Sequence, residues 1–461
     1  MVVAIGLVVV IVASIALSVA LLGSTGPSRR VQDQPSASPT SSHPITTTNA
    51  APPVWRVGWG SAMAWGNGEA SNVTVRDLAT VGTGGEAVRI RISNVFGNEP
   101  LVIGAGSVGL AAAGAGVVPG TLHALTFGGA RGTTVPVGQV SYSDAVSMDV
   151  SDLQTLAISV YVSGRELVTV HPCCTKIVSY FTPNGGGDLT GSVSGVGLSE
   201  PSPWERWVDA VDVLQTTGEG SIVVVGDSIT DGYHTSVRWT DVLQKRIDML
   251  PPSEQRAVVN EGITANALTA VVRTDDLTGG GPSGVSRLAR DALTQAGVSE
   301  VVLFLGTNDL WFGATADQVI AGYEQAIAAA HGAGVRIDVV TLLPRSTSPE
   351  ERWTPLQQRY LQQVDQWILT SGAFDAVLNL GTSVADVYDG GCAPTAIFPM
   401  YDSGDHLHPD AQGQTAMANA VDGAALDVPP LPGVPPLVTV APTPGCQGVS
   451  GIPSAITPTS R

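Results

Sequence analysis

The sequence is poor in basic residues, with 22 Lys and Arg against 40 Asp and Glu and a formal net charge of −18. Proteins that bind a phosphate backbone need a positively charged face, so this composition argues against nucleic acid as a partner. Charged residues of both signs make up only 13% of the chain, while 43% is hydrophobic. That balance is typical of a folded protein and argues against a chain that is disordered throughout.

Cysteine is scarce as well, with four residues in the chain: Cys173, Cys174, Cys392 and Cys446. None of them has a histidine and an acidic residue at a motif spacing, so no cysteine nucleophile is predicted. Four cysteines allow three complete pairings. We expect a disulfide between Cys392 and Cys446 that pins the C-terminal tail to the folded chain, and free thiols are the alternative.

Basic residues are also missing ahead of the apolar run Val2–Gly23. At about 1.5 Å per residue such a run can cross a bilayer core of roughly 30 Å. Residues 1–23 are therefore predicted to be a membrane anchor or a signal peptide cleaved near Ser18-Val19-Ala20, with a core helix as the alternative. Arg29-Arg30 would place the body of the protein in the cytoplasm, but residues 24–53, rich in Ser, Thr and Pro, are typical of a disordered extracytoplasmic tether.

The chain of 461 residues is too long for one ordinary core, so two folded domains are expected. In residues 54–207, alternating runs such as Ala87–Ile92 are separated by Gly, Asn and Pro, which predicts an all-β antiparallel sandwich. In residues 218–427, apolar strand-like runs alternate with helical segments, which predicts an α/β domain with a three-layer, doubly wound parallel sheet. Residues 428–461 form a Pro-rich tail without a predicted element.

The elements of the α/β part can be placed along the chain. Strands are expected at Ile222–Val225, Ala257–Asn260, Val301–Leu305, Ile337–Leu343 and Ala376–Leu380, and helices at Val237–Leu250, Val285–Ala296, Ala316–His331, Leu356–Thr370 and Ala411–Ala425.

One pattern in the β part imitates a dinucleotide-binding fingerprint. Gly104-Ala105-Gly106-Ser107-Val108-Gly109 has the required letters and follows an apolar run. No good crossover helix follows it, and no acidic residue stands about twenty positions further on. Nucleotide binding is therefore not predicted.

The residues suited to catalysis follow the predicted parallel strands, whose carboxyl ends converge on one crevice. Ser228 ends the first strand at the start of a turn, but serine is a weak nucleophile unless a base takes its proton. His408 can act as that base, and Asp405 can orient its imidazole. The backbone N–H groups of Ser228 and Ala265 and the side-chain amide of Asn308 can receive the oxyanion of a tetrahedral intermediate.

Each of these residues also has an ordinary structural interpretation. Ser228 can lie in a plain strand-to-helix turn, and Asn308 can simply form a loop. Asp405 can cap the helix that follows it. His406 can ligate a metal together with Asp405 and His408, although no further His or Cys lies nearby in the sequence.

The catalytic stretches resemble the SGNH hydrolases, also called GDSL-type esterases and lipases. Gly226–Thr230 matches their first block, Gly306–Asp309 the third and Asp405–Pro409 the last. The resemblance implies the catalytic roles described above. It also implies a reaction that needs no metal or cofactor. In the second block, family members usually carry a glycine where this chain has Ala265, so Gly262 is expected to relax the turn instead.

The β part resembles, more weakly, the N-terminal domain of secreted two-domain actinobacterial members, through the segment Ile92–Ala105. The sequence as a whole predicts an extracytoplasmic serine ester hydrolase, tethered to the membrane at the cell envelope or secreted. The expected substrates are O-acyl esters, above all O-acetyl esters, of carbohydrate or cell-envelope glycan. A lipase or broad acyl-ester hydrolase is the alternative, and a non-catalytic carbohydrate-binding protein is a more remote one.

Overall fold

The computed structural model describes residues 52–171, 178–216, 218–270, 280–346, 353–386 and 395–421. The predicted disulfide between Cys392 and Cys446, the apolar N-terminal run, the tether and the Pro-rich tail lie outside these residues and stay predictions. No described helix has both the length and the apolar character needed to cross a membrane.

The first half of the described chain, Val54–Gln215, contains only strands as regular elements and is named the all-β region. Its strands are β1 (Val54–Gly60), β2 (Ala64–Thr80), β3 (Gly85–Ser93), β4 (Leu101–Leu110), β5 (His123–Ala124), β6 (Thr133–Val135), β7 (Val140–Tyr142), β8 (Val146–Val150), β9 (Thr155–His171), β10 (Ser179–Phe181), β11 (Glu200–Ser202), β12 (Glu205–Arg206) and β13 (Val208–Gln215).

These strands form two antiparallel sheets, which confirms the predicted sandwich. One has the order β1-β13-β3-β7, with β8 also on β3, and the other has the order β11-β10-β2-β9-β4-β5, with β12 and β6 at its sides. Apolar side chains from both sheets, such as Ile90, Val211 and Ile158, are fully buried in one shared cluster. Alternation of apolar and polar residues along each strand produces this arrangement, because successive side chains point to opposite faces.

Two details differ from or add to the sequence analysis. The antiparallel pairing continues past Trp207, because β13 pairs with both β1 and β3. The six residues that imitate the dinucleotide fingerprint lie inside β4, paired with β9, and not in a turn between a strand and a helix.

The second half, Ser221–Val421, is named the α/β region. Its elements are β14 (Ser221–Gly226), α1 (Ser228–Asp231), α2 (Trp239–Ile247), β15 (Val258–Gly262), α3 (Gly284–Leu288), the π-helical turn η1 (Ala289–Leu293), β16 (Val298–Phe304), α4 (Thr307–Trp311), α5 (Ala316–Gly332), β17 (Arg336–Val340), α6 (Pro355–Thr370), β18 (Ala376–Leu378), the 3₁₀ turn η2 (Gly381–Ser383) and α7 (Ala411–Ala420).

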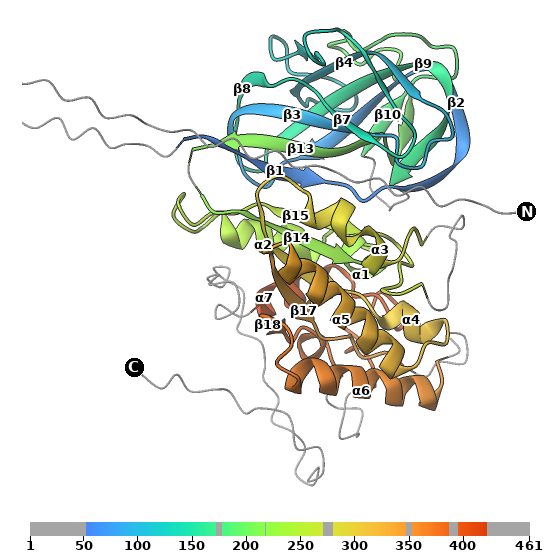
Figure 1. Cartoon of the computed structure of the whole chain (residues 1–461), viewed down its shortest axis with the longest axis vertical. Coiled ribbons are helices and arrows are strands. Elements are labelled where there is room, and N and C mark those ends of the chain that lie inside the picture. The colour runs from blue at the N-terminus through green and yellow to red at the C-terminus, as the bar shows by residue number, and fades with distance from the viewer. Residues whose placement is uncertain are drawn as a thin grey trace, which may run out of the picture. The chain divides into compact units, whose positions relative to one another are not determined.

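The five strands of this region are parallel and have the order β15-β14-β16-β17-β18. Residues alternate between the two faces of β14. Val223 and Val225 pack in the cluster that contains α5 and α6, while Ile222 and Val224 pack in the cluster that contains α2 and α7. Helices therefore cover both faces (Figure 1), which confirms the predicted three-layer parallel sheet.

Local sequence signals begin the long helices. Thr315 and Gln318 form a capping box at the start of α5, and Thr354 and Gln357 form another at the start of α6. The predicted helix Val285–Ala296 is shorter and less regular than expected, because α3 passes into the π-helical turn η1. Such turns often occur at functional sites.

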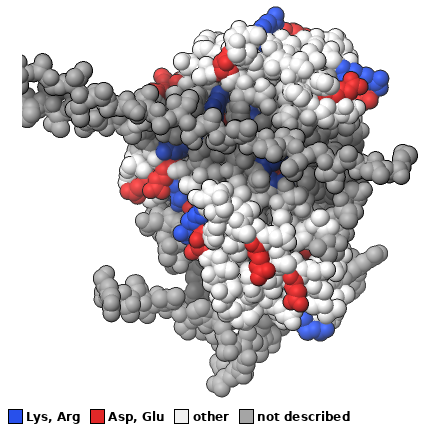
Figure 2. Space-filling model, in the orientation of Figure 1, with Lys and Arg blue, Asp and Glu red and all other residues white. Residues whose placement is uncertain are grey.

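Charged side chains are sparse on the face shown in Figure 2, where Lys and Arg are dispersed among acidic residues. The visible described surface on this face is mostly neutral, so it presents no broad positive area.

Candidate active site

The strand order places a topological switch point beside β14, because β15 lies on one side of it and β16 on the other. In open parallel sheets, ligands bind at the carboxyl ends of the strands at such a point. Ser228 follows β14, Ala265 follows β15 and Asn308 follows β16. The fold therefore brings these three predicted site residues to the same edge of the sheet.

Ser228 begins the four-residue helix α1, which is separate from the longer helix α2 that the sequence predicts after it. The carboxylate of Asp227 caps α1 by accepting a hydrogen bond from the Ile229 N–H at 2.9 Å. Gly232 ends it with a φ of 92°, a left-handed conformation that glycine adopts without a steric penalty. Both ends of the helix that carries the serine are thus capped by residues of its own short stretch of sequence.

His408 is hydrogen bonded to Ser228, with 2.8 Å between the serine Oγ and the histidine Nε2. The other ring nitrogen, Nδ1, lies 2.6 Å from Oδ2 of Asp405. The backbone N–H groups of Leu407 and His408 donate to the second carboxylate oxygen of Asp405. The helix cap of α7 is Asp410 and not Asp405, so the interpretation of Asp405 as that cap is wrong.

The Asp405 carboxylate is ionised at neutral pH. Burial by itself raises the pKa of Asp405, but hydrogen bonds from His408 and Leu407 and the charge of the imidazole outweigh burial and hold the pKa well below its usual range. A permanently charged acceptor keeps the proton of His408 on Nδ1, which leaves Nε2 to accept the serine proton.

Asn308 lies in α4 and is buried, with 7% of its surface exposed. Its amide nitrogen donates to the backbone oxygen of Asn266 at 2.9 Å and lies 3.4 Å from a carboxylate oxygen of Asp227. The side chain therefore bridges Asp227, the residue before Ser228, and Asn266, the residue after Ala265.

Ala265 has a φ of 62°, in the left-handed region that disfavours residues with a Cβ atom. The expectation that Gly262 relaxes the turn is wrong. Gly262 has no positive φ, and a Cβ there would lie 2.5 Å from the backbone nitrogen of Asp231. Gly262 is needed for close packing, and the strained conformation falls on Ala265 itself.

Two buried charged residues beside the site, Asp227 and Arg345, were not among the predicted site residues. Burial raises the pKa of Asp227 to about 6, although the Ile229 N–H and the charges of His408 and Arg345 lower it. The guanidinium of Arg345 is buried over the ring of Trp311, at 4.3 Å from the ring centroid. Asp227 belongs to the first matched block, Gly226–Thr230, whereas Arg345 stands in no recognisable pattern and is indicated only by its position in the fold.

An aromatic pair covers the histidine. The ring centroids of Tyr233 and His234 lie 5.0 and 5.9 Å from that of His408, and His234 Nε2 is 4.0 Å from Asp405 Oδ2. The sequence signal that could have indicated these two residues is their position directly after Gly232, at the end of the turn that carries Ser228. About half of the His234 side chain is exposed, so it borders the site at the surface.

The alternative in which His406, Asp405 and His408 bind a metal together is not supported by the contacts of His406. His406 pairs with Asp402 through a contact of 2.7 Å instead of joining Asp405 and His408. Across the described parts of the chain, no group of three His, Cys, Asp or Glu side chains is arranged to hold a metal ion.

The α/β region is similar to known proteins. Residues 224–416 match the model of the GDSL-like lipase/acylhydrolase family. No curated protein matches the chain. Among solved structures, a GDSL-like lipase from Bacteroides thetaiotaomicron is 16% identical with a TM-score of 0.34, the match covering 45% of this chain and 87% of that one.

Two esterases of known structure are also similar. A carbohydrate acetylesterase from Sinorhizobium meliloti is 18% identical, with a TM-score of 0.33, and the match covers 45% of this chain and 96% of that one. The aryl esterase of M. smegmatis is 18% identical with a TM-score of 0.33, over 45% of this chain and 97% of that one. The family match and the serine–histidine pair agree: residues 224–416 resemble a GDSL-like lipase/acylhydrolase domain, and the hydrogen bond between Ser228 and His408 fits the catalytic pair of a serine ester hydrolase.

Proposed function

We propose that Ser228 is the nucleophile, His408 the general base and acid, and Asp405 the residue that orients the histidine. The observation that carries this proposal is the continuous chain of hydrogen bonds from Ser228 Oγ through His408 to Asp405, at 2.8 and 2.6 Å. Both distances are within the range in which a base can accept the proton of a nucleophile.

The reaction follows from this geometry. Ser228 Oγ attacks the ester carbonyl carbon while its proton passes to His408 Nε2. Collapse of the tetrahedral intermediate expels the alcohol, which takes that proton, and leaves an acyl-serine. A water molecule then loses a proton to Nε2 and attacks the acyl group, and Ser228 recovers its proton as the acid departs. Donors from Ser228, Ala265 and Asn308 stabilise the oxyanion in both steps.

The proposed substrates are O-acyl esters, above all O-acetyl esters, of carbohydrate or cell-envelope glycan, and the proposed location is extracytoplasmic. The apolar run at residues 2–23 and the Ser-, Thr- and Pro-rich stretch after it support both proposals. A membrane anchor with a tether would hold the enzyme close to the envelope. A cleaved signal peptide would release it to act on soluble esters.

Hydrolysis of p-nitrophenyl acetate by the wild type and by Ser228→Ala tests the chemistry. We expect the variant to lose at least about 10³-fold in kcat, since removal of a triad member leaves only the oxyanion hole and substrate binding. Ser151→Ala, at an exposed serine of the all-β region, is the matched control and should keep wild-type activity. Equal activity in wild type and Ser228→Ala would reject the mechanism.

Two further measurements test the substrate and the location. Acetate release from acetylated xylan or acetylated peptidoglycan, compared with p-nitrophenyl octanoate hydrolysis, separates a glycan esterase from a lipase. Faster turnover of the octanoyl ester would favour the lipase alternative. Protease treatment of intact cells should degrade the α/β region, and full protection of that region would contradict the extracytoplasmic location.

A further inference from the structure

The turn that carries Ala265 is held on one side through its neighbour Thr264. The N–H and the hydroxyl of Thr264 both donate to Oδ2 of Asp231, at 3.0 and 2.7 Å. The other oxygen of Asp231 lies 3.2 Å from Nε2 of His171, at the end of β9 in the all-β region. Nδ1 of His171 lies 2.8 Å from the backbone oxygen of Ala62.

The partners of His171 are both hydrogen-bond acceptors, so both ring nitrogens must carry protons. Burial by itself lowers the pKa of His171, but the charge of Asp231 and its hydrogen bond outweigh burial, so the pKa is raised. Asp231 and His171 are 1% and 4% exposed. Their contact therefore joins a charged pair in a medium where water screens little.

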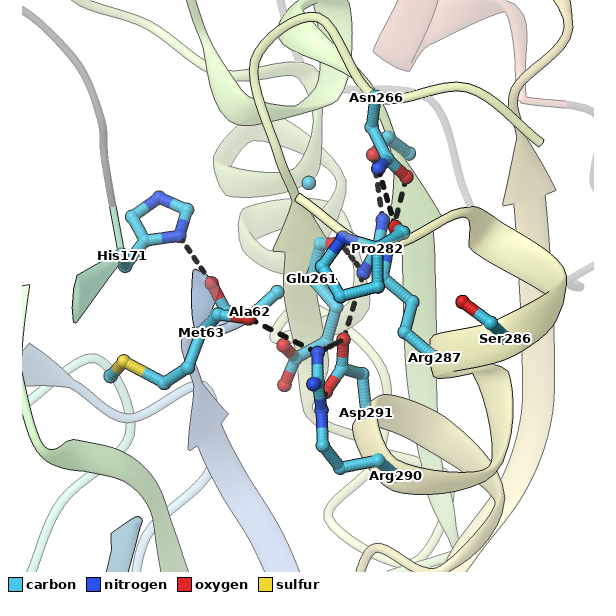
Figure 3. Close-up of polar contacts among 12 residues, drawn as sticks. Ala62, Met63, His171, Glu261, Asn266, Pro282, Ser286, Arg287, Arg290 and Asp291 are labelled. Carbon is cyan, nitrogen blue, oxygen red and sulfur yellow. Dashed lines mark hydrogen bonds and ion pairs between the residues drawn. The ribbon is translucent and has the colours of Figure 1, made fainter. Parts of the chain in front are cut away.

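A second series of contacts holds the same turn through Asn266 (Figure 3). Oδ1 of Asn266 accepts a hydrogen bond from Nε of Arg287 at 3.0 Å, and the guanidinium of Arg287 pairs with Asp291 at 3.1 Å. Arg290 donates to Asp291 at 2.8 Å and to the backbone oxygen of Met63 at 3.1 Å. Arg287 lies in α3, and Arg290 and Asp291 lie in the π-helical turn η1.

The two series flank one strained residue and end on adjacent residues of the all-β region. Ala265, with a φ of 62°, lies between Thr264 and Asn266. The series that starts at Thr264 ends at the Ala62 oxygen, and the series that starts at Asn266 ends at the Met63 oxygen. Both oxygens belong to the short connection between β1 and β2.

We propose that the all-β region contributes to the active site through His171. In this proposal His171 is a positioning residue, a clamp that holds the Ala265 turn in its left-handed conformation. The clamp directs the Ala265 N–H toward the oxyanion. The inference rests on the proposed function of Ser228 and goes beyond it. A glycine at position 265 would adopt this conformation without help. Alanine resists it, and the contacts to the all-β region supply the constraint.

A contact that only joined the two regions would act on folding and not on the chemical step. A clamp on an oxyanion donor acts on kcat, because it stabilises the transition state more than the bound substrate. It must also depend on the residue at position 265. A double-mutant cycle between His171→Ala and Ala265→Gly measures that dependence directly.

The experiment measures kcat and KM for p-nitrophenyl acetate in wild type, His171→Ala, Ala265→Gly and the double variant, with circular dichroism to verify folding. We expect His171→Ala to lower kcat about tenfold with KM changed less than about twofold, and to lower kcat less than about twofold in the Ala265→Gly background. Equal losses in the two backgrounds would overturn the proposal, as would an unchanged kcat.

Thr264→Val serves where His171→Ala does not fold. It removes the hydroxyl that donates to Asp231 at 2.7 Å and nearly preserves the side-chain shape. The same coupling with Ala265→Gly is expected, and strictly additive effects would reject the clamp. His331→Ala is the matched control, because His331 also pairs with an aspartate, Asp375, at 3.1 Å, but at the surface end of α5. It should leave kcat unchanged.

The outcomes separate the clamp from the proposed function. If Ser228→Ala hydrolyses the ester as fast as the wild type, the proposed function fails. If Ser228→Ala is inactive and the cycle shows no coupling, the function stands and only the clamp is rejected.

Discussion

The turns after β14 and β15 lie side by side at the edge of the parallel sheet, yet they are stabilised in different ways. The turn that carries Ser228 is held by near neighbours in sequence: Asp227 caps it and Gly232 takes the left-handed conformation that ends it. The turn that carries Ala265 has an alanine in the left-handed conformation. It is held by distant residues, with Asp231 on one side and Arg287 on the other.

The difference shows two ways to fix the backbone conformation of a turn at a strand end. A turn with its own cap and its own glycine needs little from the rest of the fold. A turn whose backbone conformation is unfavourable for its own residue persists only where several tertiary contacts hold it in place. The second turn should therefore depend more strongly than the first on residues far from it in sequence.

The largest effect is expected for Arg287→Met. Arg287 is buried and joins both turns, since it donates to the Gly226 oxygen at 2.9 Å and to the Asn266 side chain at 3.0 Å. Removing it also leaves Asp291 as a buried carboxylate with one cation fewer, and breaking such a pair typically costs about 3–5 kcal/mol. Urea unfolding measures the loss.

A surface arginine provides the control for that experiment. Arg131 pairs with Asp188 at 2.6 Å, but 74% of the arginine side chain is exposed. Arg131→Met should cost at most about 1 kcal/mol. Similar losses in the two variants would show that Arg287 contributes no more than a surface ion pair.

Asn308→Ala should have the next largest effect. The Asn308 amide bridges the two turns and is a predicted oxyanion donor. Its loss should lower kcat about 10²–10³-fold with little change in KM. Asn184→Ala is the control, because Asn184 makes an exposed side-chain contact with the Ser71 N–H. A kcat within about twofold of wild type in Asn308→Ala would remove this residue from the oxyanion hole.

The pH dependence of stability tests the cap of the serine turn. The pKa of Asp227 is raised to about 6, against about 3.9 in an unfolded chain. The folded state therefore binds this proton more tightly. The resulting stabilisation is complete below about pH 4 and is lost as the pH rises through about 6, in total roughly 3 kcal/mol.

Asp227→Asn should remove that contribution and retain the helix cap, since Asn caps as well as Asp. The difference in unfolding free energy between wild type and variant, measured from pH 3 to 8, should change by roughly 3 kcal/mol across the interval from about 4 to 6. The contribution of Asp405, whose pKa is lowered, is common to both proteins and cancels. A constant difference would contradict the raised pKa.

The smallest effects are expected from reciprocal exchanges in the two turns. Gly232→Ala should destabilise by about 1–2 kcal/mol, because its φ of 92° is left-handed and a Cβ there would lie 2.8 Å from Arg238. Ala265→Gly should stabilise by up to about 1 kcal/mol, because relief of strain exceeds the added entropy of the unfolded chain. Thermal unfolding measures both changes.

The control for these exchanges is Gly332→Ala. Gly332 ends α5, and a Cβ there would meet no atom within 4 Å, so the change should be neutral or slightly stabilising. If Ala265→Gly destabilised the protein instead, the left-handed alanine would not be a strained residue, and the contrast between the two turns would disappear.

Much of the fold was predictable because local sequence patterns determine where its strands and helices begin and end. The apolar run Ile222–Val225 and the capping residues Thr315 and Thr354 act on their own neighbours in sequence. The helix predicted at Val285–Ala296 was less predictable. A π-helical turn begins directly after α3, and Arg287 and Asp291 face the interior as an ion pair. Such a turn depends on tertiary packing and not on a local sequence pattern.

The sequence by itself determined the two fold classes and the members of the proposed catalytic set, Ser228, Asp405, His408 and Asn308. Alternating periods and residues placed at strand ends are local properties, and parallel strands bring such ends together. Only the tertiary structure decided how Ala265 is held. Its left-handed conformation is unfavourable for the residue itself, and its neighbours Thr264 and Asn266 are held by Asp231 and Arg287, which lie elsewhere in the sequence.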